Sequence, residues 1–373
     1  MNKVQQLAEM GQSIWYDNIE RGMLEDGEFA GMIARGEIRG VTSNPSIFMN
    51  AIAKTTEYDD DLRPLAATGR SPEDIFWELA IEDIRNAADL FRPLFDATHG
   101  GDGFVSLEVG PGQANDTEAT IAETQRLWSL TDRPNLMIKI PATLAGIPAI
   151  TTATAHGLNI NITLIFARER YAAVMDAFLS GLEQRVAAGL PIDHIASVAS
   201  FFVSRVDTNV DKRLEAIIGA GGPQAAEARS LLGKAAIANA KLAYADFQRV
   251  FSSDRFAALK AKGAQVQRPL WASTSTKNPA YRDVIYVEDL IGPDTVNTVP
   301  QKTLTALLDH AVLAQTLTAG VDEAQTDIDR LAALGIDMAD VTHELEIEGV
   351  QAFTDAFHTL LASIEKKLAA VAA

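Results

Sequence analysis

The chain has 373 residues, enough for one large α/β barrel domain or for two ordinary domains. Its 47% hydrophobic and 22% charged residues are typical of a soluble globular protein, and its formal net charge of −18 disfavours nucleic acid as a partner. It contains no cysteine, which excludes disulfides, cysteine nucleophiles and cysteine-ligated zinc and fits a reducing cytoplasm.

The beginning of the chain has no features of a targeting segment. Glu9, Asp17 and Glu20 interrupt the first twenty residues, and no apolar core of signal-peptide length is present. No run approaches the roughly 18 apolar residues that a bilayer-spanning helix needs. We therefore expect a cytoplasmic protein without membrane contact, and the sequence leaves a homodimer open.

Eight short apolar strand candidates alternate with helical stretches along most of the chain. This alternation favours a parallel sheet, and eight units indicate a closed (β/α)8 barrel, the TIM-barrel fold. A doubly wound open sheet is the alternative, but the glycine-rich turn that usually follows its first strand is missing. The candidates are Ser13–Asp17, Gly40–Ser43, Phe104–Val109, Leu136–Ile140, Asn159–Phe166, Ile195–Val203, Pro269–Ser273 and Thr295–Val299.

Three helical insertions enlarge the chain beyond a minimal barrel. They cover Pro45–Asp96, where Ser71 and Pro72 have the residue types of a helix start, then Pro223–Lys262 and a tail from about Val321 to Ala373. Apolar residues recur at helical spacing in the tail, so we expect it to pack on the barrel exterior. We therefore predict one domain over residues 1–373, with the barrel at about 10–320 and a helical C-terminal extension at about 321–373.

Lys139 is the most informative residue, because it stands alone in the apolar strand candidate Leu136–Ile140. An ammonium group in apolar surroundings loses hydration, which favours the neutral amine. A neutral amine is a nucleophile that can form an imine with a sugar ketone. The alternatives are a lysine that reaches solvent or one that pairs with a carboxylate.

Polar residues recur on one face of several strand candidates, near the ends that follow the apolar runs. Residues two apart in a strand share a face, and the opposite face of these strands is apolar. The polar set should therefore point into the barrel, where such groups are costly unless hydrogen-bonded, which favours an active site over a purely structural network. These residues are Asn159, Asn161 and Thr163, Ser106 and Glu108, and Ser200, Phe202 and Ser204, with Arg205 directly after them.

Two carboxylates supply the remaining chemistry. Asp17 ends the first strand candidate and Glu108 nearly ends the third, so both suit proton transfer around an amine. Either could instead cap a helix or pair with Lys139. The six histidines show no metal-ligand spacing. The glycine-rich stretch 100–103 precedes a strand instead of opening a helix, and we interpret it as a plain turn.

Together these motifs resemble the transaldolases, in particular the longer branch found in plants and many bacteria. The resemblance extends roughly from Ile14 to Thr303, and the combination of its motifs is highly specific. The matching segments are Gly40–Phe48 (GVTSNPSIF), Asn135–Thr143 (NLMIKIPAT), Leu158–Phe166 (LNINITLIF), Ser197–Asp207 (SVASFFVSRVD), Trp271–Pro279 (WASTSTKNP) and Thr295–Pro300 (TVNTVP).

The resemblance implies a class I aldolase-like barrel that needs neither a metal nor an organic cofactor. Lys139 would be the Schiff-base lysine. Glu108 would shuttle protons through a water held by Thr163, and Asp17 would accept the hydroxyl proton during carbon–carbon cleavage. Thr42, Asn44 and Asn161 match positions that hold the donor hydroxyls and the enamine.

The resemblance also implies where the substrate phosphate binds. Arg205 and Ser273 match the phosphate-binding positions, and the alternative for Arg205 is a pair with Asp207. In the shorter branch a second arginine lies two positions after the serine, whereas this chain has Ser275 there. Either Lys277 supplies the missing charge or the site works with one arginine.

The implied function is a transferase of the non-oxidative pentose phosphate pathway. It moves a dihydroxyacetone unit from sedoheptulose 7-phosphate or fructose 6-phosphate to glyceraldehyde 3-phosphate or erythrose 4-phosphate. One alternative is a related lysine aldolase that releases free dihydroxyacetone. Another is a non-catalytic barrel that binds sugar phosphates.

Overall fold

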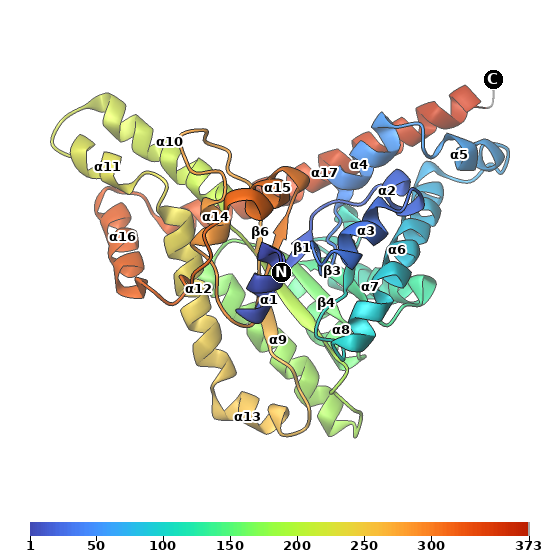
Figure 1. Cartoon of the computed structure of the whole chain (residues 1–373), viewed down its shortest axis with the longest axis horizontal. Helices are drawn as coiled ribbons and strands as arrows, with labels where there is room; N and C mark the ends of the chain where they lie inside the picture. Colours follow the sequence, from blue (N-terminus) through green and yellow to red (C-terminus); the bar gives the residue numbers. More distant parts are fainter. Residues whose placement is uncertain (372–373) are drawn as a thin grey trace.

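The computed structural model describes residues 1–371, and its centre is a sheet of seven parallel strands. Neighbouring strands follow the order β1-β7-β6-β5-β4-β3-β2, and helices surround the sheet (Figure 1). The predicted α/β barrel is therefore confirmed. The strands are β1 (Gln12–Tyr16), β2 (Val105–Glu108), β3 (Leu136–Pro141), β4 (Ile160–Ile165), β5 (Ser197–Phe202), β6 (Gln267–Ala272) and β7 (Thr295–Val299).

The eighth strand candidate, Gly40–Ser43, forms a short strand-like segment. Val41 is its bridging residue, and Arg39, Gly40 and Thr42 add backbone hydrogen bonds to β1. Val41 forms parallel bridges to Tyr16 of β1 and to Val105 of β2, and in this way it closes the barrel. The segment is short because Asn44 directly caps the next helix and Pro45 is that helix's first residue. The other seven candidates differ from the observed strands by at most a few residues at each end.

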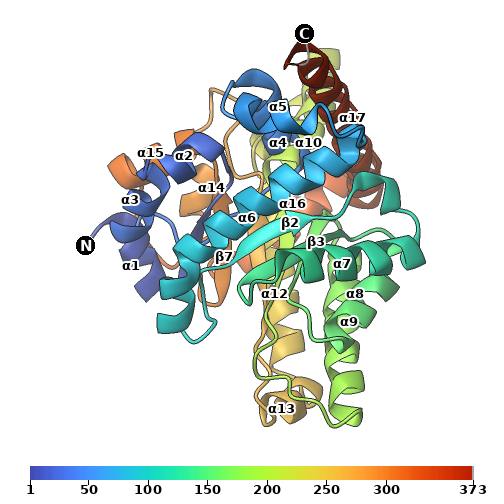
Figure 2. The same ribbon diagram turned by 90° about the vertical axis from the view of Figure 1, so that its right-hand side faces the viewer.

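The helices follow the predicted alternation and insertions. Ser71 caps α6 with its side chain and Pro72 is the first helical residue, as the sequence indicated. Helices α6 and α7 lie against β2 and β3 (Figure 2). The helices are α1 (Lys3–Glu9), α2 (Arg21–Glu25), α3 (Glu28–Ala34), α4 (Pro45–Lys54), α5 (Asp59–Leu65), α6 (Pro72–Ala97), the 3-10 helix η1 (Pro111–Gln113), α7 (Thr117–Thr131), α8 (Gly146–Ala155), α9 (Arg168–Ala187), α10 (Ser204–Ala220), α11 (Ala225–Leu231), α12 (Ala235–Phe251), α13 (Asp254–Lys260), α14 (Ile285–Glu288), α15 (Gln301–His310), α16 (Val321–Ala333) and α17 (Met338–Val371).

The helical tail packs outside the sheet and also reaches one end of it. Helix α17 packs on α4, α5, α6 and α10, contacts β4 and reaches the carboxyl ends of the strands (Figure 1). The approach is close because Gly349 faces Leu164, where a Cβ on residue 349 would come within 2.9 Å of the leucine side chain. Leu164 itself has a φ of +58° at a β-bulge in β4.

The glycine-rich stretch before β2 forms a turn, and its Asp102 side chain also connects three other residues. The buried Asp102 carboxylate accepts hydrogen bonds from Trp15 Nε1 at 2.8 Å, Ser13 Oγ at 2.5 Å and Arg39 Nε at 2.6 Å. These contacts join β1 to Arg39, which precedes Val41, and to the segment that leads into β2. They lie at the end of the barrel opposite the carboxyl ends of the strands. Asp102 therefore strengthens the part of the barrel where strand pairing is shortest.

Candidate active site

Lys139 lies at the centre of a row of polar residues that crosses three strands. In the strand register it is the neighbour of Glu108 on β2 and of Asn161 on β4. Its side chain is 6% exposed, and Nζ lies 2.9 Å from the carbonyl oxygen of Ser43 and 3.0 Å from Glu108 Oε2. The surroundings of the amine are therefore not apolar as the sequence suggested, because a carboxylate and a carbonyl oxygen contact it directly.

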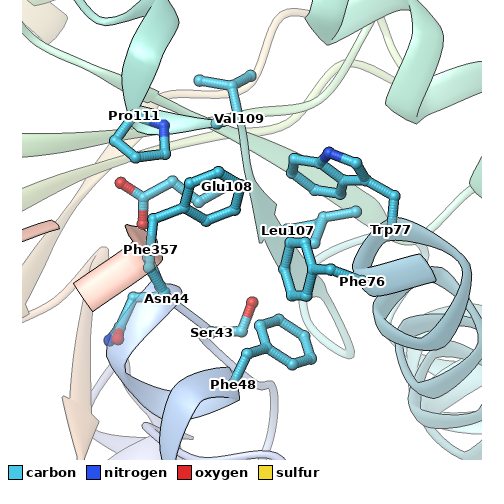
Figure 3. A pocket seen from close by; sticks show the side chains of 12 residues that line it. Ser43, Asn44, Phe48, Phe76, Trp77, Leu107, Glu108, Val109, Pro111 and Phe357 are labelled. Atoms are coloured by element: carbon cyan, nitrogen blue, oxygen red, sulfur yellow. The ribbon is translucent and has the colours of Figure 1, made fainter. Parts of the chain in front are cut away.

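Glu108 is buried between this amine and an apolar wall. Phe76 and Trp77 of α6 and Phe357 of α17 line a small cavity beside its carboxylate (Figure 3). Burial raises the pKa of Glu108 and the nearby charge of Asp17 raises it further, whereas Lys139 lowers it. A carboxyl group in this setting can take up a proton from the amine and return it.

Asp17 follows β1 and lines the same cavity as Lys139. It accepts a hydrogen bond of 2.7 Å from Thr42 Oγ1, which also lies 2.6 Å from Thr298 Oγ1. Burial raises the pKa of Asp17, while the hydrogen bond from Thr42 and the charges of Lys139 and Lys277 lower it. Two acids with raised pKa values thus lie near one lysine.

The cavity that contains Lys139, called the main cavity below, has a volume of about 220 Å³ and opens at the carboxyl ends of the strands. This is the end at which barrel enzymes carry their active sites. Of the predicted residues, Glu108, Asn161 and three members of the polar set (Ser106, Asn159 and Ser204) do not line it, whereas the others do. The lining consists of Asp17, Thr42, Asn44, Lys139, Thr163, Ser200, Phe202, Arg205, Ala272, Ser273, Thr274, Ser275, Lys277, Thr298, Pro300 and Phe353.

Asn161 lies below the cavity and holds other side chains. It is fully buried, its Nδ2 donates to Ser106 Oγ at 3.0 Å, and its Oδ1 accepts from Ser200 Oγ at 2.7 Å. The expected alternation of β5 ends at Phe202, because Ser204 is already the first residue of α10. In this structure Asn161 therefore orients Ser200, which is the member of the pair that faces the cavity.

Thr163 has a buried hydroxyl group without a protein partner. Its Oγ1 forms no hydrogen bond with any group in residues 1–371, although the residue lines the cavity. Buried hydroxyl groups are normally satisfied, and an isolated one costs free energy. The hydroxyl is thus available to a water molecule or a substrate.

Arg205 and Lys277 bring two cations to one end of the cavity. Arg205 lies in the first turn of α10, 5.4 Å from the Phe202 ring, and it forms no ion pair within residues 1–371. Lys277 Nζ donates to Ser275 Oγ at 2.6 Å. Burial and the charge of Arg205 lower the pKa of Lys277, whereas Asp17 raises it. An anion bound here would meet both cations and the helix N-terminus.

The alternative pair between Arg205 and Asp207 is not formed. Asp207 accepts instead from the hydroxyl of Tyr286 at 2.7 Å and from the backbone N–H of Ala236 at 2.8 Å. A second such bond runs from the Tyr281 hydroxyl to Asp211 at 2.6 Å. Both tyrosines follow the segment that carries Lys277, so the two bonds hold this segment against α10.

Several components of the site were not predicted from the sequence. The Ser43 carbonyl group and Thr298 lie inside motifs that had been recognised, and the alternation in β7 could have identified Thr298. Phe353 lies far along the chain on α17, where its spacing indicates only a buried helix face. Ser273 has a φ of +56°, which local sequence does not indicate for a serine.

Within residues 1–371, no group of three or more histidine, cysteine, aspartate or glutamate side chains is arranged to hold a metal ion. Within the same residues, every helix is too short or too polar to cross a membrane.

The fold and the site define an α/β-barrel enzyme with a buried lysine near two acids at the carboxyl ends of its strands. The chain belongs to the transaldolase/fructose-6-phosphate aldolase family, because the family model described as Transaldolase/Fructose-6-phosphate aldolase matches residues 14–364. It is 51% identical to a transaldolase of Thermobifida fusca and 50% identical to one of Saccharopolyspora erythraea, in each case over 98% of both chains. It is 48% identical to transaldolase 1 of Streptomyces coelicolor, over 98% of this chain and 94% of the relative.

Proposed function

We propose that this chain acts as a transaldolase in which Lys139 carries a dihydroxyacetone unit from a ketose phosphate to an aldose phosphate. The observation that supports this most directly is the position of the Lys139 amine. It is buried, it lines the main cavity, and it lies 3.0 Å from an acid. Membership of the family makes the transfer of a ketone-containing unit the expected reaction.

The first stage forms the covalent intermediate. The reaction needs the neutral amine, and Glu108 is placed to hold the proton that Lys139 gives up. The nitrogen attacks the ketone carbon of the donor to give a carbinolamine. Glu108 then returns the proton to the departing hydroxyl group, and loss of water leaves an iminium ion. The unpartnered Thr163 hydroxyl is suited to hold the water that relays these protons.

The second stage breaks and remakes a carbon–carbon bond. Asp17 removes the proton from the hydroxyl group on C4 of the donor, and the bond between C3 and C4 breaks. Its electron pair moves into the iminium group, which becomes a neutral enamine, and the aldose phosphate leaves. The enamine attacks the aldehyde carbon of an incoming aldose phosphate, and the new hydroxyl group takes the proton from Asp17. The resulting iminium ion adds one water molecule, and breaking the carbon–nitrogen bond releases the product ketose phosphate and the Lys139 amine. The raised pKa of Asp17 suits both of its proton transfers.

The phosphate end of the substrate is assigned to Arg205 and Lys277. A guanidinium group offers two parallel N–H donors to phosphate oxygens, and an ammonium group adds a point charge. Substrates of this kind are themselves charged and do not cross bilayers unaided, so we place the enzyme in the cytoplasm with its substrates.

Trapping with borohydride tests the proposal. Incubation with fructose 6-phosphate and sodium borohydride should add a reduced dihydroxyacetone unit to one tryptic peptide, with the modification on Lys139. Lys139→Ala should give no adduct. An adduct on another lysine, or none at all in the unaltered chain, would contradict the assignment.

Acceptor dependence separates transfer from simple cleavage. A transaldolase should form sedoheptulose 7-phosphate from fructose 6-phosphate only when erythrose 4-phosphate is added, with little free dihydroxyacetone. Steady release of free dihydroxyacetone without an acceptor would favour the aldolase of the same family.

A further inference from the structure

Phe353 of α17 is the one apolar aromatic side chain that the C-terminal helix contributes to the cavity within the described residues. It is 7% exposed and lines the same space as Lys139 and Arg205. The rest of the lining comes from the barrel strands and the loops that follow them, and most of it is polar. A ring from outside the barrel thus covers part of a mostly polar site.

The helix that carries this ring is fastened on both sides of it. Before Phe353, Glu344 pairs with Arg213 at 2.6 Å, and Glu346 pairs with Arg170 at 3.2 Å. After it, Lys367 pairs with Asp59 at 2.7 Å. Gly349, one turn before Phe353, lets the helix lie directly on Leu164 of β4. These contacts describe a fixed cover over the mouth of the barrel.

We propose that Phe353 determines the reaction specificity of the site by keeping water away from the enamine on Lys139. This inference rests on the proposed function. It assigns to α17 the choice between transfer of the dihydroxyacetone unit to an aldose phosphate and its release as free dihydroxyacetone.

The two routes from the enamine differ in what its carbon takes up. Release begins when the proton held by Asp17 reaches the enamine carbon through water in the cavity, which regenerates the iminium ion. Transfer begins when the same carbon attacks the aldehyde, which also gives an iminium ion. In either route one water molecule then adds to the iminium carbon, and breaking the carbon–nitrogen bond frees the product and the lysine amine. Keeping water away from the enamine therefore slows its protonation, and with it release, while the enamine waits for its acceptor.

The size of the side chain makes the effect measurable. A water molecule needs about 15 Å³ of space and polar partners, and the cavity already offers hydroxyl groups and charges. Replacing the Phe353 ring with a methyl group opens more than that volume next to these groups. Phe353→Ala should therefore admit water, whereas Phe353→Leu keeps an apolar side chain over the site.

The test measures the ratio of free dihydroxyacetone to sedoheptulose 7-phosphate, with fructose 6-phosphate as donor and erythrose 4-phosphate as acceptor. We expect Phe353→Ala to raise this ratio about tenfold, which corresponds to about 1.4 kcal/mol in the relative barriers. Phe353→Leu should give an intermediate ratio. Borohydride trapping of Lys139 should persist in both variants.

Leu360→Ala is the matched control. Leu360 is fully buried on the same helix but lies outside the cavity lining, so its loss loosens α17 without opening the cavity. An unchanged ratio in Phe353→Ala, or an equal rise in Leu360→Ala, would overturn the inference. If Phe353→Ala does not fold, a ratio in Phe353→Leu equal to that of the unaltered chain overturns it. Failure of the proposed function would be recognised separately, as absence of trapping and transfer in the unaltered chain.

Discussion

Arg205 and Lys277 belong to different segments of the barrel, yet they line one cavity and the charge of Arg205 helps to lower the pKa of Lys277. Placing two cations near each other raises the free energy of the empty site, and a bound anion removes this repulsion. The arginine two positions after Ser273 in the shorter branch is replaced here by Ser275, and Ser275 hydrogen-bonds to Lys277. Of the two alternatives that the sequence left open, this geometry favours a site with two cations.

Removing these cations should weaken substrate binding. Arg205→Ala should raise the KM for fructose 6-phosphate about 10- to 100-fold, because a charge-assisted hydrogen bond is worth about 1.5–3 kcal/mol. Lys277→Ala should have a smaller effect in the same direction, because an ammonium group is a point charge without the paired donors of a guanidinium group. Steady-state kinetics provide the measurement, and Lys212→Ala, on α10 but outside the cavity lining, is the control for net charge. An unchanged KM in Arg205→Ala would remove it from the phosphate site.

Thr163→Val should separate activity from stability. The buried hydroxyl group has no protein partner within residues 1–371, so its removal should leave the free energy of unfolding unchanged or slightly higher. Activity should fall about 10²-fold if the hydroxyl holds the water that relays protons. Thr124 of α7 also has a buried hydroxyl group without a partner in the same residues. Thr124→Val should match the stability effect and keep full activity. Equal activities in the two variants would contradict the role of Thr163.

Lys139→Met should abolish activity and also destabilise the fold. Removing one partner of a buried ion pair leaves the other charge uncompensated, at a cost of about 3 kcal/mol that falls when Glu108 takes up a proton at low pH. Adding Glu108→Gln should recover most of the stability and none of the activity. Denaturant unfolding at pH 5 and pH 8 checks both statements. A double variant as unstable as Lys139→Met would show that the pair is not the cause.

Asp207→Asn should change how stability depends on pH. Burial raises the pKa of Asp207 to about 6, so the folded protein favours the neutral carboxyl group. Its contribution to stability is complete below the ordinary pKa of 3.8 and is lost as the pH rises through about 6. From pH 5 to pH 8 the unaltered chain should therefore lose about 1 kcal/mol relative to Asp207→Asn, which carries no charge there. Parallel stability curves for the two proteins would contradict the raised pKa.

Much of the barrel could be predicted because its signals are local. The apolar runs with alternating polar residues placed seven strands correctly, and the same alternation brought Lys139, Thr163 and Ser200 to one face. The motif around Gly40–Ser43 also pointed to the correct position in the sheet. Its length did not follow from its composition, because Asn44 lies two residues after the last backbone hydrogen bond, from Thr42 to Tyr16, and caps the next helix.

The remaining features depend on contacts between distant parts of the chain. The periodicity of α17 predicts a buried face but not what that face covers, so Phe353 could not be assigned to the site. Asp102 lies in a stretch that reads as a turn, and only the fold brings Ser13, Trp15 and Arg39 to it. Glu108 was recognised as an acid, but the aromatic wall that buries it comes from two inserted helices.

Within the described part of the chain, the short segment around Val41 is the only direct connection between β1 and β2 in the sheet. Asp17 follows β1 on one side of this segment, and Glu108 ends β2 on the other. A separation of β1 from β2 would pull the two acids away from each other without disturbing the broad ladders between β3 and β6. Amide hydrogens around Val41 should therefore exchange with solvent earlier than those of β4. On heating, enzymatic activity should be lost at a lower temperature than the one at which the rest of the sheet unfolds.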